Sequence, residues 1–318
     1  MVTFKMNGLE KVEILTLEDN YINLTLGDNS NIIRRASPYK DMQFCNSILA
    51  EHGFSALIKA TTQDKTKTMI FDFGFSTDVA ARNSELLNAD LTEIEAAALS
   101  HGHLDHFGGL VEIANKIGKS SLEFVVHPAA FRSTRYMLIG SNRRIKMPSP
   151  SRETVEAAGF RIVETREPYS LFNGDILFLG EIPRKTSFEK GIPNSYYEEN
   201  GQQIHDIIED DTSLVMNLKG KGLVILSGCA HAGIINTVQY AREITGINKV
   251  HVVMGGFHLT GPAFEPIIDD TLIFMQEIGP DFIIPTHCTG RKAVLAFEQA
   301  MPDKFILNMS GTKLTFTA

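Results

Sequence analysis

The chain repeats one order of predicted elements, and this repeat limits the folds that its 318 residues can adopt. In the first half, SALIKATT and TMIFDFG flank the polar turn QDKTK, an arrangement that predicts a β-hairpin. Helical stretches and a short apolar run, EAAALS, follow the hairpin. Such an alternation is typical of layered α/β structure.

The second half has the same order. TSLVMNL and LVILSG flank a turn that contains GKG, and the helical stretch INTVQYAREITG leads to the apolar run HVVMGG. A further helical stretch leads to a last predicted strand, DFIIPT. Because each half contributes strands of this kind, we expect the strand ends of both halves to meet at one edge.

The interval between the halves, about residues 130–205, is irregular and polar apart from a strand pair around FRIVE and DILFLGEIP. A loop-rich interval of this length is typical of a lid or an appendage. Neither flanking half contains a complete core of its own. We therefore expect a single domain over residues 1–318, with this interval as an insertion.

The charge balance excludes several classes of protein. The 38 acidic and 30 basic residues give a net charge of −8, which argues against a protein that follows a nucleic-acid backbone or an anionic membrane. No apolar run approaches the roughly 20 residues of a membrane span, and the N-terminus lacks the apolar core of a secretory signal. We expect a cytoplasmic protein, and its oligomeric state stays open.

The three cysteines, Cys45, Cys229 and Cys288, lie far apart and form no C-x-x-C pair. The sequence therefore predicts neither a disulfide framework nor a zinc finger, and we expect small buried thiols. Cys229 and Cys288 stand close to histidines, so a thiolate ligand remains the alternative to packing. No G-x-S-x-G or P-loop motif is present, which excludes serine hydrolases and P-loop NTPases.

The segment directly after EAAALS has the pattern H-x-H-x-D-H, formed by His101, His103, Asp105 and His106. Residues two apart at the end of an extended run point to the same side, so His101 and His103 can bind one metal ion. Asp105 and His106 open the following turn or helix and can face a second ion nearby. Imidazole and carboxylate together suit zinc, iron or manganese better than calcium or magnesium.

Three other histidines follow predicted strands of the second half: His231 after LVILSG, His258 after HVVMGG and His287 after DFIIPT. Ligands gather beyond the carboxyl ends of strands in layered α/β folds, so we expect His231 and His287 to complete the metal centre. For His258, a metal ligand, a substrate contact and a buried hydrogen-bonding role all stay open. We predict catalytic roles for Asp105 and His258.

These motifs resemble a known family. Asp72 in IFDFG, the segment HGHLDH, His231 in SGCAHAG and His287 in THCTG resemble, in this order, the successive motifs of the metallo-β-lactamase superfamily. The resemblance spans nearly the whole chain and implies an α/β fold, the four-layer αβ/βα sandwich, with a dinuclear site at its edge. It also implies one metal ion on His101, His103 and His231, a second on Asp105, His106 and His287, and a supporting role beneath the site for Asp72.

The chain departs from the superfamily pattern at two places. Many relatives have a bridging Asp or a Cys between the third and last histidine motifs, where this chain has GGFHL and therefore His258. Flavodiiron relatives have Glu where His103 stands, so a diiron oxygen-reducing centre is disfavoured. The words AEHGFSAL, GEIPR and GGFHL are similar to a branch that contains a pterin-condensing synthase and many metal-dependent hydrolases. This similarity implies that His52, Glu181 and Arg184 line the pocket.

A locally basic run within the polar interval supplies further candidates for substrate binding. Guanidinium groups bind phosphate bidentately, although a solvated surface is the alternative interpretation. The substrate-binding candidates in this run are Arg132, Arg135, Arg143 and Arg144, with Lys146 and Arg152 beside them.

Together these features predict an enzyme with two divalent metal ions, which we expect to be zinc, with manganese or iron as alternatives. We expect it to hydrolyse a small phosphorylated or phosphodiester-like molecule through a metal-bound hydroxide. The same metal pair can polarise a leaving pyrophosphate, so the condensation of a dihydropterin diphosphate with ribofuranosylaminobenzene phosphate is an alternative. A non-catalytic metal or ligand sensor is another, and an RNA-processing nuclease is disfavoured by the charge.

Overall fold

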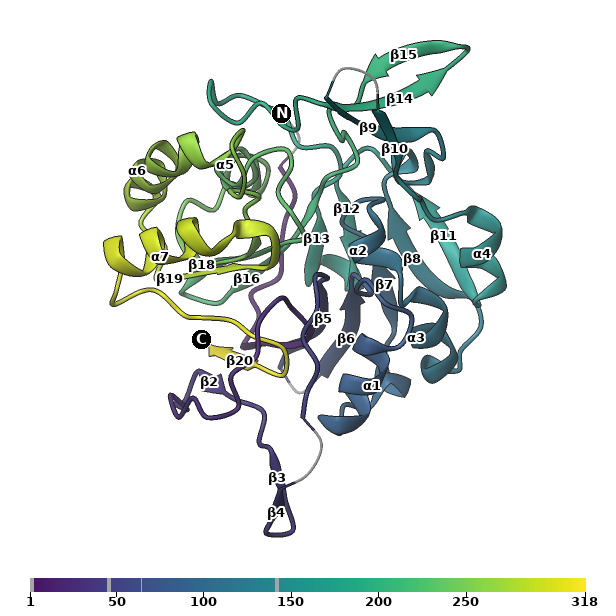
Figure 1. The fold of residues 1–318 in the computed structure, drawn as a ribbon. Helices are drawn as coiled ribbons and strands as arrows, with labels where there is room; N and C mark the ends of the chain where they lie inside the picture. Colours follow the sequence, from purple (N-terminus) through teal and green to yellow (C-terminus); the bar gives the residue numbers. More distant parts are fainter. Residues whose placement is uncertain (1–2, 45–46, 64, 141–142) are drawn as a thin grey trace.

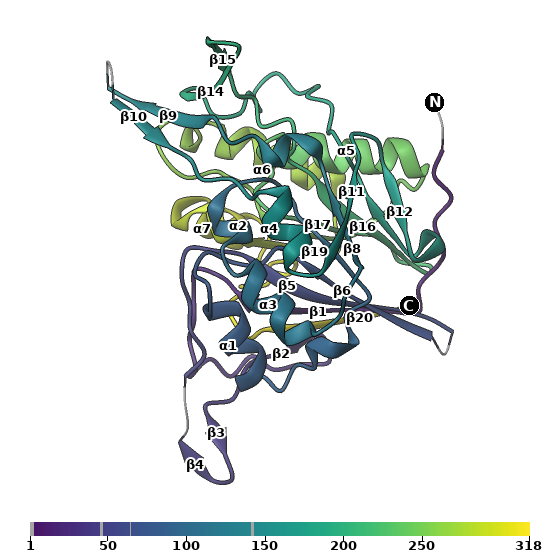
Figure 2. The same ribbon diagram turned by 90° about the vertical axis from the view of Figure 1, so that its right-hand side faces the viewer.

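The computed structural model describes residues 3–44, 47–63, 65–140 and 143–318, so Cys45 lies outside the described part of the chain. Two large β-sheets lie face to face, and helices cover the outer face of each sheet (Figure 1). Figure 2 shows the same layers after a quarter turn. This arrangement confirms the predicted four-layer αβ/βα sandwich.

The first sheet has eight strands in the order β11-β8-β7-β6-β5-β1-β20-β2. Their bounds are β1 Lys11–Glu18, β2 Ile33–Arg34, β5 Ser55–Thr62, β6 Lys65–Phe71, β7 Ala96–Ala98, β8 Leu122–Val126, β11 Phe160–Glu164 and β20 Lys313–Thr317. Its outer face packs on three helices, α1 (Val79–Leu86), α3 (Leu110–Ile117) and α4 (Arg152–Ala157). The predicted first hairpin is confirmed, because β5 and β6 pair antiparallel.

The second sheet has six strands in the order β12-β13-β16-β17-β18-β19. Their bounds are β12 Tyr169–Leu171, β13 Ile176–Phe178, β16 Ser213–Leu218, β17 Gly222–Ser227, β18 Val250–Gly256 and β19 Phe282–Thr286. The helices on its outer face are α5 (Ile234–Thr245), α6 (Ile268–Ile278) and α7 (Arg291–Ala300). The second predicted hairpin is also confirmed, because β16 and β17 pair antiparallel.

The central core lies between the two sheets. Ile14 and Phe71 of the first sheet belong to the same buried cluster as Met216, Leu226 and Met254 of the second. Every residue of β17 and of β18 is buried, because helices cover the other face of these strands. This double burial explains why both strands are almost continuously apolar in the sequence.

The polar interval of about residues 130–205 is divided between two places in the fold. Strands β9 (Arg135–Ile139), β10 (Arg143–Lys146), β14 (Ser195–Glu199) and β15 (Gln202–His205) form a small sheet of their own, which projects at the top of Figure 1. However, β11, β12 and β13 belong to the two large sheets. The predicted pairing of FRIVE with DILFLGEIP is therefore wrong, since β11 pairs with β8 and β13 pairs with β12 and β16.

The carboxyl ends of several strands lie at one edge of the sandwich. Strands β6, β7 and β8 are parallel neighbours in the first sheet, and β17, β18 and β19 are parallel neighbours in the second. Parallel strands end on the same side, so the loops after β7, β17, β18 and β19 gather at this edge. Within the described residues, every helix is too short or too polar to cross a membrane.

Candidate metal centre

The loop after β7 carries the first set of candidate ligands. It leads through His101 and His103 into the short helix α2 (Leu104–Phe107), whose first turn contains Asp105 and His106. Gly102 is required in this loop, because a Cβ atom there would lie 2.2 Å from the carbonyl oxygen of Ala130. The close approach holds the backbone between the two histidines against the neighbouring η2 turn (Pro128–Phe131).

Three imidazole rings converge at this loop. The Nε2 atom of His101 lies 3.0 Å from Nδ1 of His103 and 3.2 Å from Nε2 of His231, and all three side chains are buried. Burial lowers the pKa of His103 to about 4 and the pKa values of His101 and His231 well below their usual range. The three rings are therefore neutral, and their facing nitrogen atoms lie close enough together to bind one cation.

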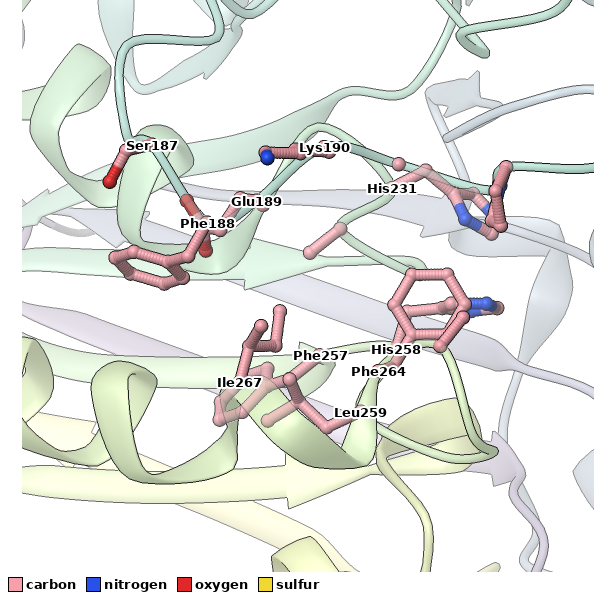
Figure 3. A pocket seen from close by; sticks show the side chains of 15 residues that line it. Ser187, Phe188, Glu189, Lys190, His231, Phe257, His258, Leu259, Phe264 and Ile267 are labelled. Carbon is pink, nitrogen blue, oxygen red and sulfur yellow. The ribbon is translucent and has the colours of Figure 1, made fainter.

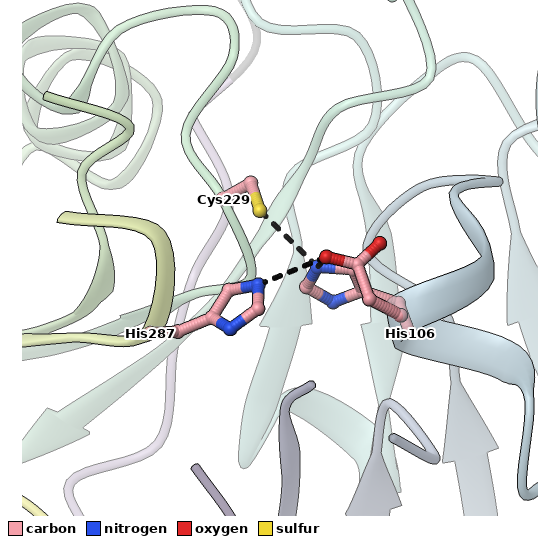
Figure 4. Close-up of side chains that lie close together, drawn as sticks. His106, Cys229 and His287 are labelled. Atoms are coloured by element: carbon pink, nitrogen blue, oxygen red, sulfur yellow. Dashed lines mark hydrogen bonds and ion pairs between the residues drawn. The ribbon is translucent and has the colours of Figure 1, made fainter. Parts of the chain in front are cut away.

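A second set of donors lies beside the first. Oδ2 of Asp105 is 3.2 Å from Nε2 of His287 and 3.8 Å from Nε2 of His106, and Sγ of Cys229 is 3.1 Å from the same His106 nitrogen. Figure 4 shows His106, Cys229 and His287 turned toward one another. The four donor atoms lie within 4.8 Å of each other, so they can surround one metal ion. The sequence predicted three of these residues as ligands and, for Cys229, favoured packing with a thiolate ligand as the alternative.

Asp72 lies beneath the two donor sets and is fully buried. Its Oδ2 atom is 2.7 Å from Nδ1 of His106 and accepts the Ser100 hydroxyl at 2.7 Å, while its Oδ1 atom accepts the Ser100 backbone N–H at 2.7 Å. Burial alone lowers the pKa of His106, but the charges of Asp72 and Asp105 raise it to about 9. The contact orients His106 so that Nε2 faces the centre.

His287 is held in the same manner by two residues that sequence reasoning missed. Its backbone N–H donates to Asp19 at 2.9 Å, and its Nδ1 atom lies 3.0 Å from Oδ1 of Asn20. Both residues directly follow β1, so a polar pair at the end of a strand with alternating polar and apolar residues was the available signal. They leave Nε2 of His287 directed at Asp105.

His258 lines a cavity of about 430 Å³, together with His231. The ring centroids of His258 and His231 are 4.4 Å apart, and that of Phe264 is 4.5 Å from the His258 ring. Figure 3 shows Phe188, Phe257 and Phe264 on the cavity wall, and Lys190 lies across the cavity from Phe264. His258 has a left-handed backbone with φ of 46°, a strained conformation for a residue with a side chain.

Comparison with known proteins decides the family. Residues 50–183 match the model of the Metallo-beta-lactamase superfamily. Over 304 residues the chain is 34% identical to the 7,8-dihydropterin-6-methyl-4-(beta-D-ribofuranosyl)-aminobenzene-5'-phosphate synthase of Methanocaldococcus jannaschii, covering 93% of this chain and 99% of the relative. The chain belongs to the metallo-β-lactamase superfamily. A second protein of the same archaeon, an uncharacterized one, is 33% identical over 253 residues, or 79% of this chain and 88% of that protein.

Solved structures agree with this membership at the level of the fold. A metal-dependent hydrolase of the beta-lactamase superfamily has a TM-score of 0.72 at 24% identity and covers 96% of this chain and 100% of its own. The metallo-beta-lactamase fold protein YhfI of Bacillus subtilis has a TM-score of 0.51 at 10% identity, with coverage of 96% and 100%. The chain is thus an enzyme of the metallo-β-lactamase superfamily, and both hydrolase and transferase chemistry fit the comparisons.

Arg135 is placed differently from the expectation that it binds substrate. It is only 1% exposed, and its guanidinium donates to Asp206 at 2.7 Å and to both carboxylate oxygens of Asp210. Oδ2 of Asp210 also accepts the backbone N–H of Gly102 at 2.8 Å. Arg135 is therefore paired with two carboxylates. Through Asp210, this buried ion-pair network of the small sheet supports the H-x-H loop of the metallo-β-lactamase site.

The other basic candidates of the interval are turned to acidic or aromatic partners. Arg132 donates to Glu209 at 2.9 Å and stacks on Tyr197, and Arg144 pairs with Glu198 on the surface. Arg152 pairs with Glu164, and Arg143 and Lys146 are exposed. Among the described residues that line the cavity at His258, none belongs to this run. The structure thus does not bring these arginines to the metallo-β-lactamase centre.

The three pocket-wall candidates have different surroundings. Nε2 of His52 lies 3.4 Å from Oδ2 of Asp105, so His52 stands at the centre. Arg184 donates to the carbonyl oxygen of His231 at 2.6 Å and holds that loop in place. Glu181 is exposed, and its carboxylate lies 3.2 Å from Arg166. Of the three candidates, only His52 has its side chain beside the side chain of a predicted metal ligand.

Proposed function

We propose that this enzyme holds two divalent metal ions, zinc with manganese or iron as alternatives, and hydrolyses a small phosphorylated or phosphodiester-like substrate. The observation that carries this proposal is the convergence of two adjacent donor sets. One contains His101, His103 and His231, and the other contains Asp105, His106 and His287. Their mutually facing donor atoms lie close enough together to bind a pair of cations.

Two such ions would activate a water molecule and neutralise the charge that develops on a phosphoryl group. The chain itself orients the donors. Asp72 fixes His106, and Asp19 with Asn20 fixes His287. Asp105 has Oδ2 within 3.4 Å of Nε2 of His52, so this pair can take up a proton from the attacking water.

His258 is the proposed proton donor to the leaving group. Its Nδ1 atom is buried and has no hydrogen-bond partner among the described residues, although the side chain as a whole is half-buried at the cavity. An imidazole in this place can reach a leaving oxygen next to the centre and supply its proton. The ring of His258 lies next to that of His231, so it is adjacent to the first donor set.

The cavity supports a small substrate with an apolar body and an anionic group. Its volume of about 430 Å³ falls within the usual range of small-molecule sites. Phe188, Phe257 and Phe264 supply apolar walls, and Lys190 supplies a positive charge (Figure 3). The net charge of −8 and the carboxylate-paired arginines support a small molecule over a nucleic acid. We place the reaction in the cytoplasm.

A transferase reaction is the second candidate, and the 34% identity over 99% of the archaeal synthase favours it. In that reaction a dihydropterin diphosphate would join ribofuranosylaminobenzene phosphate, and pyrophosphate would leave. The aromatic walls of the cavity also suit a planar ring system. The two candidates share the centre and differ in whether water or the second substrate attacks.

The decisive experiment incubates the metal-loaded enzyme separately with a panel of phosphomonoesters and phosphodiesters and with the two pterin precursors, followed by mass spectrometry. Hydrolysis of one ester class, reduced about a hundredfold in a His258→Ala variant that retains its metal, is the expected result. Formation of the condensed product would establish the transferase instead. Full metal occupancy with no turnover of either set would indicate a sensor and overturn both.

A further inference from the structure

We propose that Cys229 is a thiolate ligand shared by both halves of the metal centre, an inference that rests on the proposed function. Three groups of possible metal-binding donors occur among the described residues, and Cys229 belongs to all three. Its partners are Asp105, His106 and His287 in one group, His101 and His231 in the second, and His258 and Cys288 in the third. No other residue is common to more than one of these groups.

The position of the sulfur atom fits coordination. A tetrahedral zinc ion with bonds of about 2.0 Å to nitrogen and 2.3 Å to sulfur separates the two ligand atoms by about 3.5 Å. Sγ of Cys229 is 3.1 Å from Nε2 of His106, and it lies within 4.8 Å of the other donors in each group. Small shifts on binding therefore bring the sulfur within bonding distance of either ion.

The loop that carries Cys229 has little freedom to turn the sulfur elsewhere. A Cβ atom at the preceding Gly228 would lie 2.1 Å from the Ser100 hydroxyl and 2.9 Å from Oδ2 of Asp72. Ala230, the next residue, has a left-handed backbone with φ of 53°. The tight contact presses the end of β17 onto the residues that support the centre, and Cys229 is only 2% exposed.

Cys288 provides a natural comparison because it is equally buried beside the centre. Its thiol is turned toward the backbone carbonyl oxygen of Cys229, at 3.6 Å, and it belongs to only one donor group. We therefore assign the ligand role to Cys229 alone. Its thiol proton would leave to solvent when the metal binds.

A sulfur ligand would also set the metal preference. Thiolates favour zinc and other late metals, whereas manganese prefers oxygen donors. Cys229 thus favours zinc over manganese at this centre. Loss of the sulfur should weaken zinc binding more than manganese binding.

Cobalt substitution tests the proposal directly. The Cys45→Ser, Cys288→Ser double variant retains only Cys229, so its cobalt(II) form should show the near-ultraviolet charge-transfer band of a cobalt–thiolate bond. The Cys229→Ser variant should lose the band and bind zinc at least about tenfold more weakly in chelator competition. Its affinity for manganese should change less than about threefold.

Two results would overturn the inference while leaving the metal centre intact. One is bound cobalt with visible ligand-field bands but no thiolate band in the double variant. The other is a band that persists in Cys229→Ser and disappears in Cys288→Ser. Failure of the wild-type protein to bind cobalt or zinc at all would instead overturn the metal centre itself, so the two failures are distinguishable. The double variant keeps the test valid if Cys229→Ser does not fold.

Discussion

The histidines at the edge of the sandwich and the basic run of residues 132–152 are both polar clusters, but their partners differ. His101 and His231 face each other with neutral nitrogens 3.2 Å apart. Arg135 faces Asp206 and Asp210, and Arg144 faces Glu198. The histidine nitrogens face one another, whereas carboxylates neutralise the arginines. A concentration of one residue type therefore indicates a ligand site only when the fold leaves its charge or lone pairs without a partner.

The largest effect is expected at the histidine cluster. His101→Ala removes a nitrogen that faces both His103 and His231, so we expect a loss of one metal ion and a fall in kcat/KM of about 10⁴-fold. Metal analysis and steady-state kinetics check both effects. His205→Ala is the matched control. The His205 ring belongs to the small sheet, away from the donor sets, and is hydrogen-bonded to the carbonyl oxygen of Ile192. Equal effects of the two substitutions would contradict the special status of the cluster.

Arg135 is expected to affect stability rather than substrate binding. Arg135→Met leaves Asp206 and Asp210 buried without their cation, so the free energy of unfolding should fall by about 3–5 kcal/mol. Urea denaturation measures this loss. A variant of wild-type stability with a selectively raised KM would show instead that Arg135 contacts substrate.

Asp72 links the cluster to its support. Asp72→Asn removes the charge that orients His106 while keeping the shape of the side chain, so metal affinity should fall by about 10–100-fold. Competition with a chromogenic chelator measures the change. An unchanged affinity would mean that the backbone alone positions the ring.

The smallest effect is expected on the surface of the basic run. Arg144→Met breaks an exposed ion pair with Glu198, and water screens such pairs, so both the loss of stability and the change in KM should be minor. Thermal unfolding and substrate titration check this. A rise in KM of tenfold or more would restore the phosphate-binding interpretation of this segment.

Sequence reasoning located the histidines because local pattern and strand ends are both visible along the chain. It missed Asp19 and Asn20, since these residues reach His287 only after β1 and β19, which lie far apart in the sequence, have folded together. Arg135 was assigned to substrate for the same reason, because its partners lie 71 and 75 residues away. The pairing of β11 and β13 failed because strand propensity does not specify the sheet to which a strand belongs.

We propose that the two adjacent donor sets bind two metal ions. Its most direct test is to load metal-free protein with zinc, remove the excess by dialysis and measure zinc per chain by mass spectrometry. We expect about two zinc ions per chain in the wild-type protein and about one in His101→Ala. A wild-type protein that retains no zinc, manganese or iron after loading would contradict it.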